Sequence, residues 1–251
     1  VKPYQASDIV KWQQGFARHE LHHIKVNAED GSTVLHGLYL DNKDSNEVVF
    51  FIPGNGMKVA VGGIQALHAF SQFDRDIVIF DRRGLGASNG QASIANLISD
   101  SVAQVDYIKE QLQAEQVIVH GFSLGSFVAA QLAKRLNIDG LVLQGSATNV
   151  NDWIDVRTPW YMKPFLTIDI EEVFHTVDNR AIVANDYTGP LLIIGGSKDQ
   201  QAPAQLSKYL YEASRSGNKQ LVIAEGAKHN NMFDHQETRQ AYLEFLASIN
   251  S

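Results

Sequence analysis

The sequence predicts an α/β fold with a mostly parallel eight-stranded sheet flanked by helices. Six short, largely apolar runs indicate strands that are buried on both faces. Helical patterns separate these runs, and such alternation is typical of a parallel sheet covered by helices. The six runs are residues 48–52, 77–80, 117–120, 141–144, 191–194 and 221–224.

Two further strands are expected near the beginning of the chain. Residues 21–27 and 33–40 flank Asp30-Gly31, and Asp-Gly between two such runs is a strong signal for a β-hairpin. We expect these strands to be antiparallel and to lead into the parallel sheet, which brings the total to eight.

Four stretches carry helical patterns. Apolar residues recur every three or four positions from Ile94 to Leu112, and again from Tyr242 to Ile249. Residues 124–136 are rich in small and apolar side chains, which is typical of a buried helix. Residues 203–214 begin with proline, which favours the first turn of a helix.

The segment from about residue 149 to residue 189 breaks this alternation. It holds no convincing strand, and plain loops of this length are unusual between strands. We therefore predict a single domain over residues 1–251, with a small helical cap inserted at about 149–189. Alternatively, the aromatic residues of the insertion simply pack it onto the body of the domain. These residues are Trp153, Trp160, Tyr161, Phe165 and Phe174.

Composition narrows the class of protein. A length of 251 residues suits one α/β domain. The net charge of −7 disfavours nucleic acid as a partner, because phosphate binding needs a basic face. The absence of cysteine excludes disulfides, iron–sulfur clusters and cysteine nucleophiles.

The sequence carries little information on location. No apolar run approaches the ~20 residues of a membrane span. The chain begins with Val1 rather than Met, so a leader or an anchor could precede it. We expect a cytoplasmic protein. The alternative is a periplasmic protein, or one anchored to a membrane through an upstream segment.

The strongest motif is Gly121-Phe122-Ser123-Leu124-Gly125, which lies between a predicted strand and a predicted helix. In this context G-x-S-x-G forms a tight turn that lifts the serine hydroxyl clear of the sheet. Glycines flank the serine because side chains there would collide with neighbouring backbone. The helix N-terminus that follows favours negative charge developing near Ser123.

With this motif the chain resembles the α/β-hydrolase superfamily over essentially its whole length. It is most similar to the serine-aminopeptidase-like and α/β-hydrolase-domain acylhydrolases. That branch carries an H-G-N type loop, a D-x-R-G-x-G-x-S loop, G-x-S-x-G and a G-A-x-H-N segment. The corresponding segments here are residues 53–56, 81–88, 121–125 and 226–230.

The resemblance implies a serine hydrolase with Ser123 as nucleophile. A serine needs a base, and the base needs a group that orients it. In this fold the chain order is Ser, then Asp or Glu, then His. His229 and Asp199 follow the last two apolar runs, so we predict them as base and orienting acid. Rival candidates are His120 and His235 for the base, and Asp178 and Asp186 for the acid.

Acyl transfer also needs donors for the oxyanion. The N–H of Leu124, directly after the nucleophile, is the expected first donor. The family pattern implies the N–H of Asn55 as the second. Pro53 stands where the family commonly has histidine, which puts in doubt a side-chain role at that position. Residues 81–88, including Arg83 and its neighbouring glycines, are expected to be structural.

Two other patterns are set aside. Residues 19–23 match H-E-x-x-H, a zinc-protease signature that needs both histidines on one face of a helix. They lead into a strand instead, where the two histidines would be spread along ~13 Å. Residues 54–56 and 84–86 do not complete the dinucleotide-binding pattern G-x-G-x-x-G. We therefore expect neither a metal nor a cofactor.

The expected reaction is hydrolysis of a carboxylic ester or thioester through an acyl-enzyme. The aromatic residues of the predicted cap favour an apolar acyl group, so the expected partner is a small-molecule or acylated substrate. Two alternatives stay open at this point. One is a peptidase or amidase with the same triad, and the other is a non-catalytic binding protein of the same fold.

Overall fold

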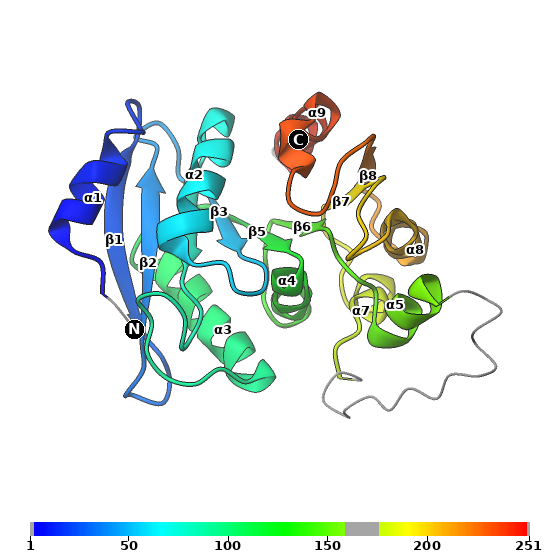
Figure 1. Cartoon of the computed structure of the whole chain (residues 1–251), viewed down its shortest axis with the longest axis horizontal. Coiled ribbons are helices and arrows are strands. Elements are labelled where there is room, and N and C mark those ends of the chain that lie inside the picture. The colour runs from blue at the N-terminus through cyan, green and yellow to red at the C-terminus, as the bar shows by residue number, and fades with distance from the viewer. Residues whose placement is uncertain (1–2, 159–175, 250–251) are drawn as a thin grey trace. The chain divides into compact units, whose positions relative to one another are not determined.

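In a computed structural model of the chain, residues 3–158 and 176–249 are described. The chain divides into two compact units, Val1–His120 and Gly121–Ser251. All eight predicted strands are present and belong to a mostly parallel sheet, which confirms the predicted fold class (Figure 1). The extent of the predicted single domain and of its cap insertion stays a prediction.

The first unit contains four neighbouring strands in the order β1–β2–β4–β3. The β1–β2 and β2–β4 pairs are antiparallel, whereas β3 and β4 are parallel, as the predicted hairpin leading into a parallel sheet requires. Its elements are α1 (Ala6–Gln13), β1 (Glu20–Asn27), β2 (Val34–Asp41), β3 (Glu47–Ile52), α2 (Ile64–Phe70), β4 (Asp76–Phe80), α3 (Ile94–Glu110) and most of β5 (Gln116–Phe122).

The turn of the β1–β2 hairpin is fixed by its own side chains. Asp30 Oδ1 accepts hydrogen bonds from the N–H groups of Ser32, at 2.9 Å, and Thr33, at 2.8 Å. Gly31 has φ of 67°, a left-handed conformation that glycine adopts without steric cost. The Asp-Gly pair therefore closes the hairpin in the way its sequence predicts.

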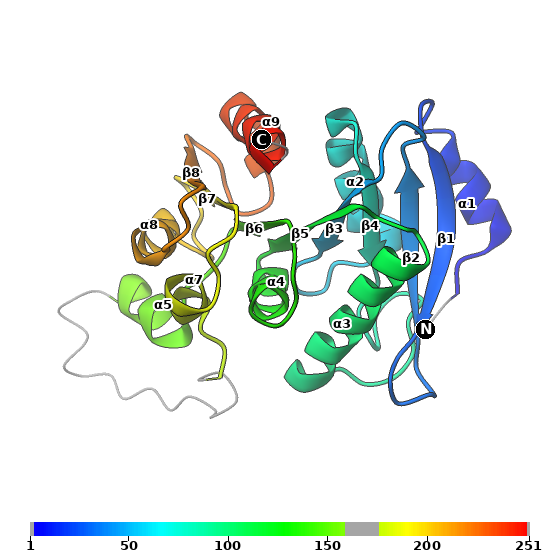
Figure 2. The same cartoon turned by 180° about the vertical axis from the view of Figure 1, so that it is seen from behind.

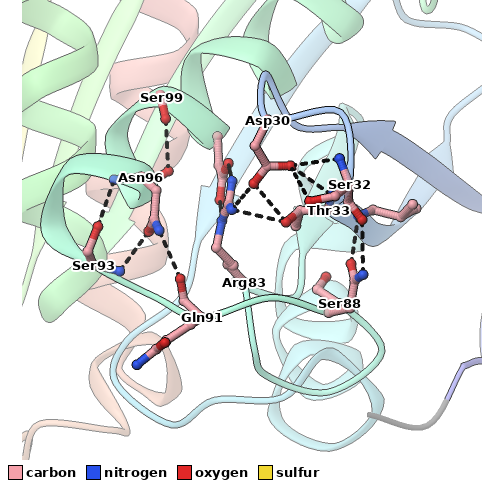
Figure 3. A network of polar contacts seen from close by, with 12 residues as sticks. Asp30, Ser32, Thr33, Arg83, Ser88, Gln91, Ser93, Asn96 and Ser99 are labelled. Carbon is pink, nitrogen blue, oxygen red and sulfur yellow. Dashed lines mark hydrogen bonds and ion pairs between the residues drawn. The ribbon is translucent and has the colours of Figure 1, made fainter.

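Arg83 ties this turn to α3 (Figure 3). Its guanidinium is 8% exposed and binds the two carboxylate oxygens of Asp100 through Nε, at 2.9 Å, and Nη2, at 2.6 Å. Nη1 reaches Asp30 and also donates to Thr33 Oγ1, at 3.0 Å. The paired acids hold the Arg83 pKa above its usual value, Asp100 contributing most. These contacts fit the structural role predicted for this loop.

Asp81 organises the same loop from inside. Its carboxylate is fully buried and accepts N–H hydrogen bonds from Val59, at 2.8 Å, and Ala87, at 2.9 Å, as well as the hydroxyl of Tyr4. Gly86 has φ of 59°, and a Cβ atom there would lie 2.2 Å from this carboxylate. Glycine is required at position 86 because backbone and carboxylate approach so closely.

The second unit contains the parallel strands β6, β7 and β8. Helices α4 and α8 pack on these strands from one side and α9 from the other, in both Figure 1 and Figure 2. Its elements are α4 (Leu124–Arg135), β6 (Gly140–Gln144), α5 (Val150–Arg157), α7 (Asn179–Asn185), β7 (Leu191–Gly196), α8 (Ala204–Ala213), β8 (Lys219–Ala224) and α9 (Gln236–Ile249).

Strand β8 departs from the expected burial on both faces. Only Ala224 is buried, and the five residues before it are half-exposed. Strand β8 is the last in the sheet order, so one of its edges has no neighbouring strand. An apolar run alone does not distinguish an edge strand from a central one.

Helices α5 and α7 lie in the segment for which a helical cap is predicted. Helix α7 packs against α4 and α8, and α5 packs against α8. Of the predicted cap aromatics, Trp153 lies in α5, whereas Trp160, Tyr161, Phe165 and Phe174 lie outside the described residues. Across residues 3–158 and 176–249, no helix has both the length and the apolar character needed to cross a membrane.

Candidate active site

Ser123 stands alone between β5 and α4 in a conformation that residues other than glycine rarely adopt. Its φ is 52° and its ψ is −118°. Such strain costs about 1–3 kcal/mol and tends to occur at functional sites. At Gly121 a Cβ atom would lie 2.5 Å from the carbonyl oxygen of Gly125, so the turn cannot accept a side chain there. The predicted strand–turn–helix context of the motif is therefore present.

Hydrogen bonds on both sides of Ser123 hold the strained turn. The Ser123 N–H donates to the carbonyl oxygen of Gln144 in β6, at 2.8 Å. The Ser123 carbonyl accepts from Ser126 twice, from the N–H at 3.0 Å and from Oγ at 2.5 Å. These bonds anchor the turn to β6 and to the first turn of α4.

A buried polar chain supports the Ser126 hydroxyl. Ser126 Oγ lies 2.9 Å from Ser146 Oγ, which accepts a hydrogen bond from Asn179 Nδ2 at 3.0 Å. All three side chains are fully buried. A hydroxyl has one hydrogen, so Ser126 Oγ donates to either the Ser123 carbonyl or Ser146 Oγ, while Ser146 Oγ donates to the Ala147 carbonyl at 2.8 Å. These contacts connect Asn179 of α7 to the turn that holds Ser123.

The predicted base reaches the predicted nucleophile. His229 lies in the turn after β8, with Nε2 2.9 Å from Ser123 Oγ. Its imidazole is 8% exposed, and its ring centroid lies 5.1 Å from that of Phe122. The turn is fixed by the Asn231 side chain, whose Oδ1 accepts the Lys228 N–H at 2.7 Å.

The predicted acid lies on the other side of the imidazole. Asp199 Oδ2 is 2.7 Å from His229 Nδ1. Asp199 Oδ1 accepts the N–H groups of Gln201, at 2.8 Å, and Ala202, at 2.9 Å. The carboxylate is fully buried. Because each of its oxygens has a hydrogen-bond partner, the buried charge is not left unsatisfied.

The other candidates for the base and the acid have different surroundings and partners. Asp178 caps α7 by accepting the Ala181 N–H at 2.9 Å, and Asp186 binds Lys134 at 3.1 Å. His120 is fully buried in β5. His235 is half-buried, with Nδ1 3.9 Å from a Glu237 carboxylate oxygen.

Sequence reasoning did not single out Gly145, which gives the imidazole its space. Gly145 directly follows β6 and has φ of 55°. A Cβ atom there would lie 3.1 Å from Cε1 and 3.2 Å from Nδ1 of His229. The signal for this role was a glycine at the end of a parallel strand, where this fold gathers its functional groups.

The two predicted oxyanion donors lie in different units. Leu124 is the first residue of α4, and the first N–H groups of a helix have no acceptor within the helix. Asn55 lies in the loop after β3, where its Oδ1 accepts a hydrogen bond from Arg82 Nη2 at 3.3 Å. The joint role of Leu124 and Asn55 stays a prediction.

The zinc-protease pattern at residues 19–23 lies mainly on β1 rather than on a helix. His23 Nε2 instead contacts His36 Nδ1 at 2.9 Å. Within the described part of the chain, no group of three or more His, Asp or Glu side chains is arranged to hold a metal ion.

The arrangement around His229 can move a proton. A carboxylate accepts hydrogen bonds only, so Nδ1 must carry the hydrogen that faces Asp199. Nε2 of the neutral imidazole then presents a lone pair to the Ser123 hydroxyl. Because both partners are buried, a positive charge on the imidazole would be stabilised by Asp199 with little screening by water.

A strained serine at a strand–helix turn, followed along the chain by an acid and a histidine at strand ends, is the arrangement of the α/β-hydrolase class. A family model described as "alpha/beta hydrolase fold" matches residues 47–169. The chain belongs to the α/β-hydrolase superfamily.

Known relatives agree with this assignment. The lysophosphatidylserine lipase ABHD12 of Danio rerio is 27% identical over 185 residues, which are 68% of this chain and 48% of the relative. The chain spans about half of the length of the curated relatives it matches.

Solved structures show the same fold over nearly the whole chain. An esterase of Pyrococcus furiosus, Pf2001, superposes with a TM-score of 0.74 at 20% identity, covering 99% of this chain and 96% of the esterase. Est1E of Butyrivibrio proteoclasticus, solved with ferulic acid bound, superposes with a TM-score of 0.69 at 18% identity, covering 90% of this chain and 98% of Est1E.

Proposed function

We propose that this chain is a serine hydrolase that cleaves carboxylic esters or thioesters through an acyl-enzyme. The observation that carries the proposal is the continuous hydrogen-bonded series from Ser123 Oγ to His229 Nε2, at 2.9 Å, and from His229 Nδ1 to Asp199 Oδ2, at 2.7 Å. The names of two relatives, a lipase and an esterase, favour an ester over an amide as substrate.

The proposed reaction has two steps. Ser123 Oγ attacks the carbonyl carbon while His229 Nε2 takes its proton, and Asp199 stabilises the resulting imidazolium. The N–H groups of Leu124 and Asn55 are the proposed donors to the oxyanion. His229 then protonates the leaving alcohol or thiol. Water, deprotonated by His229, releases the acid from Ser123 and restores the enzyme.

The first test is labelling with a fluorophosphonate probe, together with hydrolysis of p-nitrophenyl esters from acetate to palmitate. We expect wild type to react with both, and Ser123→Ala to lose both reactions. Ser99→Ala is the matched control, because Ser99 lies on α3 in the first unit and its Oγ bonds only to the carbonyl of Asn96 among the contacts described.

The outcomes separate the remaining alternatives. Labelling of wild type without ester hydrolysis, but with hydrolysis of acyl-p-nitroanilides, would favour an amidase. No labelling of a folded wild type would overturn the serine-hydrolase proposal and leave a binding protein of this fold. The ester length with the highest kcat/KM would report the size of the acyl site.

A further inference from the structure

Two backbone peptide groups hold the Asp199 carboxylate. One joins Gln200 to Gln201, and its N–H donates to Asp199 Oδ1 at 2.8 Å. The next joins Gln201 to Ala202, and its N–H donates to the same oxygen at 2.9 Å. Because Oδ1 is occupied in this way, Oδ2 is left to face His229.

Helix α5 binds the opposite sides of these same two peptide groups. Trp153 Nε1 donates to the carbonyl oxygen of Gln201 at 2.7 Å. Arg157 Nη1 donates to the carbonyl of Gln200 and lies 3.3 Å from that of Gln201. Each peptide group thus accepts from α5 on one side and donates to Asp199 on the other.

The two donors on α5 also support each other. The Arg157 guanidinium carbon lies 4.7 Å from the centroid of the Trp153 ring, within the range of a cation–π contact. Trp153 is 37% exposed, which makes it one of the few large apolar residues on the described surface.

Helix α5 is itself fixed at its beginning. Asn149 Oδ1 caps the helix by accepting the Asp152 N–H at 2.8 Å. Asp152 Oδ2 binds Arg180 Nη1 of α7 at 3.1 Å. In Figure 1 and Figure 2, α5 lies beside α7 and α8, and the Asp199 turn leads directly into α8. Trp153 and Arg157 therefore donate from a helix that is held by its own contacts, not from a loop.

We propose that Trp153 and Arg157 are positioning residues of the triad, which fix the two peptide groups that hold Asp199. This inference rests on the proposed serine-hydrolase function. Hydrogen bonds in series polarise one another, so donors on the carbonyls strengthen the N–H bonds to Asp199. They also prevent rotation of the peptide planes, which would turn both N–H groups away from the carboxylate.

The simplest competing explanation is that Trp153 only attaches the insertion to the body of the protein. The two explanations predict different kinetics. Loss of an attachment alone changes stability or substrate binding, whereas a misplaced Asp199 lowers the rate of the chemical step with KM unchanged. Small errors in position suffice, since a misplacement of about 1 Å can cost 10²-fold in rate.

The test uses variants that remove one hydrogen bond at a time. Trp153→Phe keeps a ring but lacks the N–H, and Arg157→Met keeps the aliphatic stem but lacks the guanidinium. We expect each to lower kcat for a p-nitrophenyl ester by about 10-fold, with KM unchanged within about 2-fold. Trp12→Phe, in α1 of the first unit, is the matched control and should leave kcat unchanged.

A double-mutant cycle locates the effect. In an Asp199→Asn background, Trp153→Phe should cause no further loss, because the indole acts through the carboxylate. Losses that multiply, or a change confined to KM, would overturn the proposal. Equal urea midpoints for wild type and Trp153→Phe would show that kcat does not fall through partial unfolding.

A second readout does not depend on activity. The proton between His229 Nδ1 and Asp199 can be followed by NMR in ¹⁵N-histidine protein and assigned with His229→Gln. We expect Trp153→Phe and Arg157→Met to shift this resonance, even if no ester or probe reacts with wild type. An unchanged resonance in both variants would overturn the positioning role independently of the proposed function.

Discussion

His229 and Asp199 form a buried pair whose contact, from Nδ1 to Oδ2, measures 2.7 Å. The carboxylate is fully buried and the imidazole 8% exposed, so water competes little for this bond. Three features of the chain converge on the pair: the N–H groups that hold Asp199, the contacts of α5 behind them, and the glycine that leaves room for the imidazole.

Asp199→Asn tests the pair directly. Asparagine keeps the shape of the side chain but can present an N–H to Nδ1, which favours the tautomer with the proton on Nε2 and removes the acceptor that Ser123 needs. We expect kcat to fall by about 10⁴-fold with little change in KM. Steady-state kinetics on the best p-nitrophenyl ester measure this, and a loss below 10-fold would contradict the assigned acid.

Gly145→Ala tests the space beside the imidazole. The substitution places a Cβ atom 3.1 Å from His229 Cε1 and forces alanine into φ of 55°. The conformation alone costs about 1–2 kcal/mol of stability. Gly31→Ala is the matched control, because Gly31 has φ of 67° and nothing within 4 Å of a Cβ atom. We expect both variants to lose stability in urea, but Gly145→Ala alone to lose kcat.

Arg83→Met tests the network that ties the hairpin turn to α3. It leaves the buried carboxylate of Asp100 without its cation, and breaking such a pair costs about 3–5 kcal/mol. We expect a lower midpoint of urea unfolding. The double variant Arg83→Met with Asp100→Leu should recover part of the loss, since it removes the stranded charge. No recovery would show that the guanidinium acts through Asp30 and Thr33 instead.

The pair of His23 and His36 should make stability depend on pH. Burial, then the neighbouring His36 and Lys25, lower the pKa of His23 to about 4, and burial also lowers the pKa of His36. Between about pH 4 and 6.5 the unfolded chain binds more protons than the folded chain, so stability rises with pH and is lost as pH falls.

His23→Phe keeps a ring between Tyr4 and His36 but does not titrate. We expect urea unfolding at pH 5 and pH 7 to show a smaller difference in stability for this variant than for wild type. An equal difference in both proteins would show that other groups account for the acid sensitivity.

Much of the fold could be predicted because its signals are local. Each of the six apolar runs falls within a strand, and the Asp30-Gly31 turn joins β1 to β2. Ser123, Asp199 and His229 could be proposed as site residues from the sequence. A strand–turn–helix motif marks the first, and the other two follow the ends of β7 and β8.

Other features depend on contacts that no local pattern encodes. Helix α1 spans only eight residues and none of them is buried, so it gives too short a pattern to predict a helix. The role of Gly145 depends on a histidine 84 positions later in the chain. The contacts of Trp153 and Arg157 are made to backbone carbonyls, which carry no side-chain signature at Gln200 and Gln201.

The spacing of the triad along the chain bears on how activity returns after denaturation. His229 and Asp199 are separated by 30 positions, whereas His229 and Ser123 are separated by 106. Closing the longer loop loses more conformational entropy, so the contact between His229 and Asp199 can form while Ser123 is still remote. Refolding should therefore restore reactivity toward a fluorophosphonate only when the 106-position loop between Ser123 and His229 has closed.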